Sequence, residues 1–163
     1  MKIIAVDPGF ERLGIAIIEK ESRGKEVLLF SECFKTSANL PFEERLLLIG
    51  NEISKLIGEY SPEALSIETL FFTNNQKTAM HVAETRGAII YEALKNGLQL
   101  FEFNPVQIKA AVTGSGRADK KQVISMIHKL IVIKNKLKHD DEYDAIACGL
   151  TFFAYQKSAY PQA

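Results

Sequence analysis

Three short apolar runs fall within the first 34 residues, and only a few turn-forming or charged residues separate them. The runs cover residues 3–7, 13–18 and 26–34, with the turn signals Pro8-Gly9 and Ser22-Arg23-Gly24-Lys25 between them. Apolar runs of this length with turn residues between them are typical of β-strands. Because the connections are short, we expect the three strands to form an antiparallel meander.

Helical and extended patterns alternate after the meander. Helices are predicted from about residue 42 to Ser61-Pro62, over 77–95, over 105–112, from a cap at Asp119 to about Ile133, and over 141–155. Strands are predicted over 64–67 and 98–103, the first of them parallel to residues 3–7. The order βββαβαβα is that of a ribonuclease-H-like α/β fold, with a five-stranded mixed sheet and helices on both faces. We expect one domain over residues 1–163.

The charge balance conceals an uneven distribution along the chain. The formal net charge is +0, with 20 basic and 20 acidic residues. Residues 105–139 nevertheless hold eight basic residues against a single acid, Asp119, so this stretch has a net charge of +7. The stretch could be an ordinary solvated helix, or it could form one face for a polyanion.

The cellular setting is expected to be the cytoplasm. No apolar run approaches the roughly 20 residues of a membrane span, and the short apolar run that stops at Asp7 does not fit a signal peptide. The two cysteines, Cys33 and Cys148, lack metal-ligand spacing and are too few for a disulfide framework.

Four carboxylates stand where predicted elements begin or end. Asp7 closes the first strand and Glu68 the fourth, while Asp141 and Asp144 open the last helix three residues apart and therefore on one face. Asp140 competes for the same face, although its simpler role is an N-cap. The acids at this helix end could serve only capping and dipole compensation. Combined with acids at two strand ends, a metal site is favoured.

A cluster of carboxylates binds hard cations such as Mg²⁺, and carboxylate-held Mg²⁺ usually acts on phosphates. Hydrolysis of a phosphodiester requires an activated water and a stabilised leaving oxygen, and two metal ions about 3.5–4 Å apart can supply both. Without the metal ions the acids repel one another, so the pKa of at least one should be raised. Four acids therefore suit two-metal phosphodiester chemistry.

Four stretches of the chain together resemble the RuvC family of Holliday-junction resolvases. They are Val6-Asp7-Pro8-Gly9 with Gly14, Ser66-Ile67-Glu68-Thr69-Leu70-Phe71, Glu84-Thr85-Arg86-Gly87, and Asp141-Glu142-Tyr143-Asp144-Ala145-Ile146-Ala147. The resemblance covers nearly the whole chain in order and spacing. It implies a ribonuclease-H-like homodimer that cuts two opposed strands of a four-way DNA junction with Mg²⁺, with Mn²⁺ as an alternative and two ions per active site.

The resemblance also assigns residues. It makes Asp7, Glu68, Asp141 and Asp144 the catalytic metal ligands and leaves Asp140 as the cap. The residues that it or the basic stretch places on DNA are Phe71, Asn75, Lys109, Arg117, Lys120 and Lys121. Either Phe71 or Phe72 could fill the core instead of stacking on a base, and Asn75 could merely form the turn.

The resemblance further implies partners. The helix over 77–95 would pair the two subunits, unless its small residues only pack on the sheet of the same chain, and RuvA and RuvB would cooperate with the enzyme. Three rival functions stay open: an actin-like kinase, for which 163 residues lack room, an inactive junction-binding module, and a YqgF-type nuclease acting on RNA.

Overall fold

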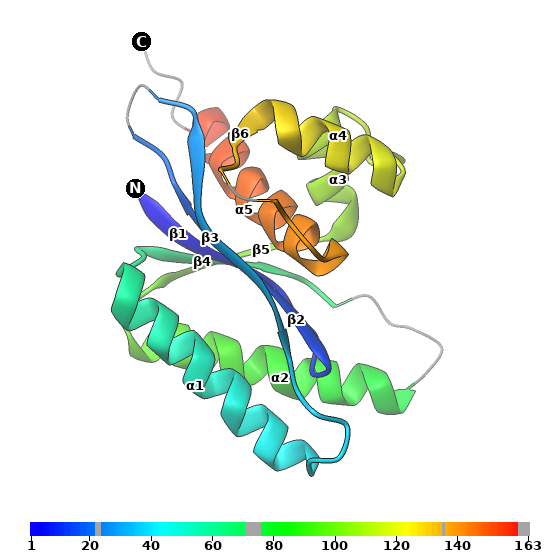
Figure 1. Ribbon diagram of the computed structural model, residues 1–163. Coiled ribbons are helices and arrows are strands. Elements are labelled where there is room, and N and C mark those ends of the chain that lie inside the picture. Colours follow the sequence, from blue (N-terminus) through cyan, green and yellow to red (C-terminus); the bar gives the residue numbers. More distant parts are fainter. Residues whose placement is uncertain (22–23, 71–75, 135, 160–163) are drawn as a thin grey trace.

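The computed structural model describes residues 1–21, 24–70, 76–134 and 136–159, and within them the chain forms a mixed sheet of six strands (Figure 1). The strands lie in the order β5-β4-β1-β2-β3-β6. Their bounds are β1 Lys2–Asp7, β2 Arg12–Glu19, β3 Glu26–Lys35, β4 Ala64–Glu68, β5 Gln99–Phe103 and β6 Ile131–Val132. The antiparallel pairing of β1 with β2 and of β2 with β3 confirms the meander. β4 pairs in parallel with β1, as predicted, and β5 with β4.

The described sheet has one strand more than the five predicted from the sequence. β6 pairs in parallel with the start of β3, where Ile131 lies opposite Glu26. The sequence pattern places these residues in a helix that runs to about Ile133, whereas the helix ends at Leu130. The β-branched side chains of Ile131 and Val132 favour extended backbone, and burial of Ile131 in the core stabilises the short strand.

The helices cover both faces of the sheet, as predicted. Their bounds are α1 Phe42–Tyr60, α2 Gln76–Lys95, α3 Pro105–Thr113, α4 Lys120–Leu130 and α5 Asp140–Ala159. In Figure 1, α1 and α2 lie against one face, and α3, α4 and α5 lie on the other. No helix in the described ranges combines the length and apolar character needed to cross a membrane.

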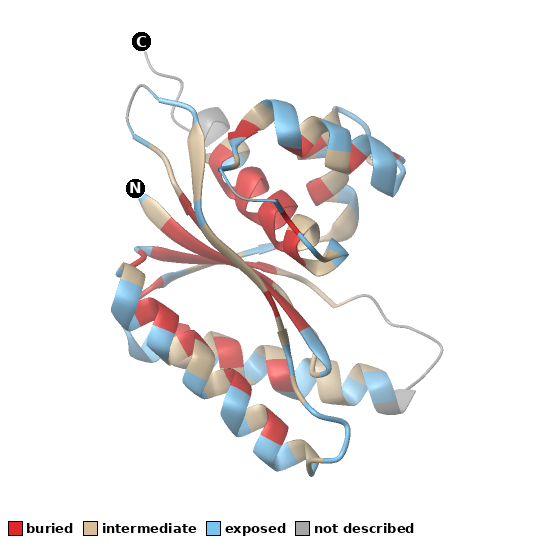
Figure 2. Ribbon diagram, viewed as in Figure 1, coloured by how far each residue is buried: buried red, intermediate tan, exposed pale blue. Residues whose placement is uncertain are grey.

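The strand β1 separates two hydrophobic cores. Ile3 and Ala5 pack in the core beneath α3, α4 and α5, whereas Ile4 and Val6 pack in the core beneath α1 and α2. This alternation follows from the two-residue period of a strand, and it makes the centre of the sheet buried on both sides (Figure 2). Asp7 is the next residue in the series of Ile3 and Ala5, so its side chain emerges on the α5 face.

Candidate active site

Asp7 and Glu68 end two neighbouring parallel strands. Val6 lies opposite Ile67 in the pairing of β1 with β4, so the two acids take the next position along each strand. Ser66 lies two residues before Glu68 and donates a 2.9 Å hydrogen bond to a backbone carbonyl of α5. Because alternate residues share a face, Glu68 also emerges on the α5 side. The fold therefore brings together two acids that lie 61 residues apart.

The N-terminal turn of α5 lies against β2 at Gly14, the residue that pairs with Asp7. A Cβ atom at position 14 would lie 2.2 Å from the backbone oxygen of Asp141 and 3.2 Å from Cβ of Asp7. The first of these distances is an overlap of atoms, so only glycine permits this approach. A glycine inside a strand often marks such a close approach of another backbone. The approach places the start of α5 over the ends of β1 and β4 (Figure 1).

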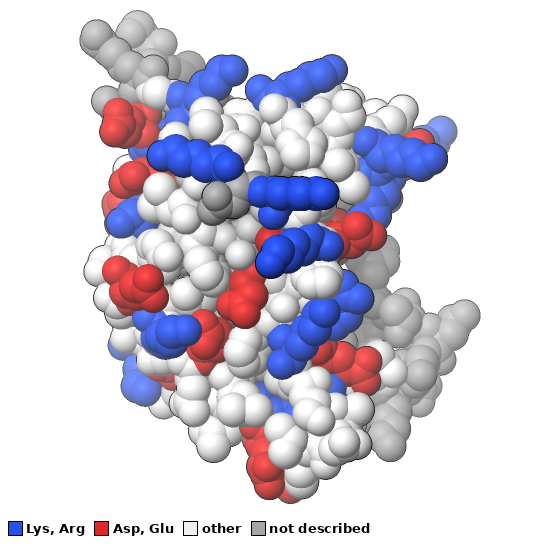
Figure 3. All heavy atoms as spheres, viewed as in Figure 1, with Lys and Arg blue, Asp and Glu red and all other residues white. Residues whose placement is uncertain are grey.

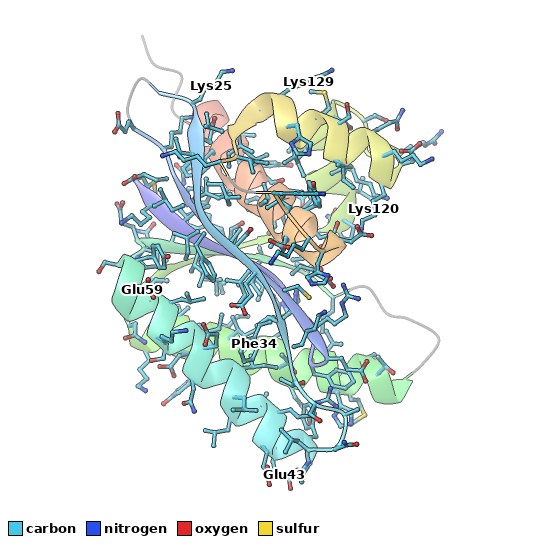
Figure 4. The ribbon with its side chains drawn as sticks, viewed as in Figure 1. Lys25, Phe34, Glu43, Glu59, Lys120 and Lys129 are labelled. Carbon is cyan, nitrogen blue, oxygen red and sulfur yellow. The ribbon has the colours of Figure 1, made fainter. Side chains whose placement is uncertain are left out.

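A cavity of about 330 Å³ opens at this junction of elements. Its charged lining residues are Asp7, Glu68, Asp144, Lys109 and Lys120, and α3, α4 and α5 add Pro105, Ile108, Val123 and Ala147. Figure 4 shows Lys120 at the start of α4, beside the N-terminal end of α5. Three of the four predicted metal ligands thus line one cavity with two of the predicted DNA-binding lysines.

The two strand-end acids have strongly raised pKa values. Burial, followed by the nearby charges of Glu68, Asp144 and Asp141, raises the pKa of Asp7 to about 7, although Lys120 opposes the shift. Burial and then Asp144 raise the pKa of Glu68 to about 7, with Lys109 acting in the opposite direction. A bound cation would remove the repulsion that helps to raise these pKa values.

Lys120 is the cation that faces Asp140 and Asp144 at the start of α5. Asp119 caps α4, as predicted, because its carboxylate accepts a 2.9 Å hydrogen bond from the backbone of Gln122. The cap leaves Lys120 as the first helical residue, and its Nζ donates a 2.9 Å hydrogen bond to Asp144 and lies 3.4 Å from Asp140. This one ammonium group therefore offsets part of the negative charge at the start of α5.

The predicted N-cap role of Asp140 differs from what the structure shows. Asp140 is itself the first residue of α5, and its exposed carboxylate faces Lys120. Glu142 instead satisfies the backbone at this helix start, since its Oε1 accepts hydrogen bonds of 2.9 and 3.0 Å from the amides of Lys138 and His139. Its Oε2 accepts a 2.7 Å hydrogen bond from the Ser31 hydroxyl, which ties α5 to β3.

Asp141 does not line the cavity with the other three acids. Both Nε and a terminal nitrogen of Arg12 donate to its Oδ2. In the described ranges, no group of three or more His, Cys, Asp and Glu side chains is arranged to hold a metal ion. The donor chemistry still fits a hard divalent cation, because carboxylates are its preferred ligands and three of them line one cavity. A cation that binds all four acids would compete with Arg12 for Asp141 and with Lys120 for Asp144.

The predicted DNA-binding residues fall into three groups. Lys109 and Lys120 line the cavity, whereas Arg117 and Lys121 line a separate groove at the start of α4. Phe71 and Asn75 lie outside the described residues, as does the alternative Phe72. On the face shown in Figure 3, Lys and Arg side chains gather over the half of the molecule that contains α4. The basic stretch 105–139 thus contributes residues on both sides of the α4 N-terminus.

Comparison with known proteins identifies the family. The family profile described as "Crossover junction endodeoxyribonuclease RuvC" matches residues 3–152. The chain belongs to the RuvC family. The RuvC of Ruminiclostridium cellulolyticum is 39% identical over 150 residues, which cover 92% of this chain and 90% of that protein. The RuvC of Thermosipho melanesiensis is 42% identical over 147 residues, which cover 90% and 93%.

Solved RuvC structures share the architecture. The Thermus thermophilus RuvC structure has a TM-score of 0.89 at 30% identity and covers 98% of this chain and 97% of that one. T. thermophilus RuvC in complex with a Holliday junction substrate has a TM-score of 0.91 at 29% identity and covers 98% and 96%. The yeast mitochondrial Holliday junction resolvase is 12% identical and has a TM-score of 0.68. The match covers 97% of this chain and 82% of that one, and at this identity it shows a shared fold alone. These likenesses confirm the ribonuclease-H-like fold and the predicted family.

Sequence reasoning missed an anchor for the turn after Asp7 in this RuvC-family chain. Arg45 of α1 is buried, and its Nε donates a 2.8 Å hydrogen bond to the hydroxyl of Thr36. A terminal nitrogen donates at 3.3 Å to the carbonyl of Phe10, and the guanidinium lies 4.8 Å from the centre of the Phe10 ring. The only sequence signal is a charged residue inside an apolar helical pattern. Arg45 thereby fixes the turn that carries both Asp7 and Arg12.

The raised pKa values predict how stability depends on pH in the metal-free protein. An acid whose pKa is about 7 when folded and about 4 when unfolded binds more protons in the folded state between these values. The free energy of unfolding should therefore fall as pH rises from about 4 to about 7. Asp7 alone should contribute on the order of 2–4 kcal/mol to this fall, and Asp7→Asn should remove that part.

Urea unfolding in EDTA at pH 5.5 and 8 measures this effect. The control is Glu59→Gln, which neutralises an exposed acid of α1 on the other face of the sheet. An equally steep loss of stability in Asp7→Asn and in the control would contradict the prediction.

Proposed function

We propose that this protein is a metal-dependent endonuclease that resolves four-way DNA junctions by cutting two opposed strands. The observation that supports it most is the cavity in which Asp7, Glu68 and Asp144 meet Lys109 and Lys120. Acids and lysines at one point suit a phosphodiester held by cations. Membership of the RuvC family, together with likeness to T. thermophilus RuvC bound to a Holliday junction, supports a four-way DNA junction as the substrate.

The proposed chemistry assigns a role to each charged group. Asp7, Glu68, Asp141 and Asp144 would hold Mg²⁺, or Mn²⁺ in its place, at two positions. Two such ions activate a water molecule and stabilise the leaving oxygen of an in-line displacement. Lys109 and Lys120 face the same cavity and would orient the scissile phosphate and offset its charge.

A homodimer is part of this proposal, because a symmetric junction calls for two sites related by a two-fold axis. The outer face of α2 supports it. Met80, Gly87, Tyr91 and Leu94 recur on this face at helical spacing, and the three large side chains are 52–67% exposed. A Cβ at Gly87 would meet nothing within 4 Å. Ile89 and Ala93 on the inner face are buried against α1 and the sheet, so α2 has one face free for a second copy.

A substrate panel tests the function. The purified chain with Mg²⁺ should cut a synthetic four-way junction and leave linear duplex DNA and RNA uncut, and EDTA should abolish cleavage. A plasmid with an extruded cruciform reports the dimer, because paired cuts give linear product whereas independent cuts give nicked circles. Preferential cleavage of RNA would favour a YqgF-type nuclease, and tight junction binding without cleavage would favour an inactive binding module.

We expect the groove at the α4 N-terminus to bind DNA phosphates other than the one that is cleaved. Arg117 and Lys121 are exposed and line this groove. Each phosphate contact contributes about 0.9 to the slope of log K against log salt concentration. The double variant R117Q/K121Q should therefore lower the slope for junction binding by about two, as measured by fluorescence anisotropy between low and moderate salt.

The matched control is Lys55→Gln on α1, an exposed lysine on the opposite side of the sheet that pairs with Glu52 at 2.8 Å. Its slope should equal that of the unaltered protein. A double variant whose slope also stays unchanged would remove this groove from the DNA path.

A further inference from the structure

Asp141 is held by three donors that all converge on one of its oxygens. Arg12 Nε donates to Oδ2 at 3.1 Å, a terminal nitrogen of Arg12 donates to the same atom, and the thiol of Cys33 donates to it at 3.4 Å. The three donors come from β2 and β3, whereas Asp141 lies at the start of α5. The carboxylate oxygen is thus occupied before any cation arrives.

This arrangement separates Asp141 from the acids that it would have to join. Asp7, Glu68 and Asp144 line the cavity, and Asp141 does not. Asp141 is nevertheless close enough to Asp7 for its charge to raise the pKa of Asp7. The backbone of Asp141 is fixed against Gly14. Asp141 therefore differs from the other three acids only in the direction of its side chain and in the partner that the side chain binds.

The partner of Asp141 cannot release it by losing a proton. An arginine guanidinium stays charged throughout the accessible pH range, so Asp141 can be freed only when another cation takes its place or an anion takes Arg12. The ion pair is partly exposed, with 50% of the Arg12 side chain and 20% of the Asp141 side chain accessible. Ion pairs in such positions are weak, which makes an exchange of partners feasible.

We propose that Arg12 is a placeholder cation that holds Asp141 away from the cavity, and that a divalent ion must compete with Arg12 for this carboxylate. The inference rests on the proposed function, because it takes Asp141 as a metal ligand. Arg12 is then a positioning residue that sets the affinity and order of metal binding. The alternative is that the Arg12–Asp141 ion pair only stabilises the packing of the β1–β2 turn against α5.

A double-mutant cycle on the DNA-free protein separates these two roles. Calorimetric titration with Mn²⁺ is carried out on the unaltered protein, R12Q, D141N and R12Q/D141N. If Arg12 competes for Asp141, R12Q should bind Mn²⁺ about two- to fivefold more tightly, as expected for the loss of a partly exposed ion pair. The same change in the D141N background should have no effect, because the contested carboxylate is absent.

The cycle also excludes a general effect of charge. Removing any positive charge near a cation site strengthens cation binding, because it removes electrostatic repulsion. That effect would persist in D141N. Cys33→Ala offers a variant without a change of charge, since it removes only the third donor to Oδ2, and it should tighten Mn²⁺ binding slightly. Arg12→Lys retains the charge and can make a single contact, so its affinity should lie between those of the unaltered protein and R12Q.

Unchanged or weaker Mn²⁺ binding in R12Q, with circular dichroism showing an intact fold, would overturn the proposal, and so would a gain that persists in D141N. If R12Q does not fold, the same comparison is made with Arg12→Lys and Cys33→Ala, and unchanged affinity in both would overturn it. Because the titration contains no DNA, its failure is distinct from a failure of junction cleavage.

Discussion

Replacing Asp7 by Asn is expected to abolish Mg²⁺-dependent cleavage of a four-way junction while leaving the fold intact. Asp7 lies near all three other acids, since the charges of Glu68, Asp144 and Asp141 each raise its pKa. The amide retains the shape of the carboxylate but removes the charge that would hold the metal ions. Metal ions of this kind supply several kcal/mol of transition-state stabilisation, so the single-turnover rate should fall on the order of 10³-fold.

Junction affinity measured in Ca²⁺ or EDTA should stay the same or increase, because one negative charge disappears from the proposed DNA-cleavage site. Glu59→Gln on α1 is the control for the loss of an acid, and it should cut at the normal rate. If Asp7→Asn cut the junction within tenfold of the unaltered rate, the proposed role of the cavity would be wrong.

The change Gly14→Ala is expected to damage both stability and cleavage, although glycine has no functional group. The added methyl would lie 2.2 Å from the backbone oxygen of Asp141, so the start of α5 must move away from β2. Overpacking of this kind typically costs about 1–3 kcal/mol. A displacement of about 1 Å in a catalytic group can cost on the order of 10²-fold in rate, and here the displaced turn carries Asp141 and Asp144.

Gly58→Ala is the matched control. Gly58 lies in α1, and a Cβ there would meet nothing within 4 Å. Alanine in a helix is favoured over glycine by about 0.5–1 kcal/mol, so this variant should be slightly more stable and fully active. Urea unfolding and junction cleavage on both variants make the comparison. Normal stability and activity in Gly14→Ala would show that α5 does not depend on its close contact with β2.

The sequence predicts those parts of the site that depend on local pattern. Asp7 and Glu68 each end an apolar run, and two strands that run in parallel end at the same edge of a sheet, so their meeting follows from the strand order. Asp144 shares a helix with Asp141, and the spacing of three residues puts both near one face. A glycine inside a strand, such as Gly14, often marks the close approach of another backbone, and the structure shows that this backbone is that of α5.

The parts that could not be predicted depend on contacts between distant segments. Arg12 and Asp141 lie 129 positions apart, and no local pattern indicates which cation an acid will face. Glu142 is buried and accepts a hydrogen bond from Ser31, 111 positions away. β6 was missed for a related reason, because two residues become a strand only when β3 offers an edge to pair with.

The position of α5 along the chain has a consequence for how the enzyme is made. α5 follows every other described element, and the hydrophobic core beneath α3 and α4 includes seven or more of its apolar side chains, among them Ala145, Phe152 and Phe153. Asp7 and Glu68 can meet as soon as β1 and β4 pair, but Asp144 joins them only when this last helix docks. A chain still emerging from the ribosome without α5 therefore lacks the third acid of the proposed site, which is complete only after the last helix has docked.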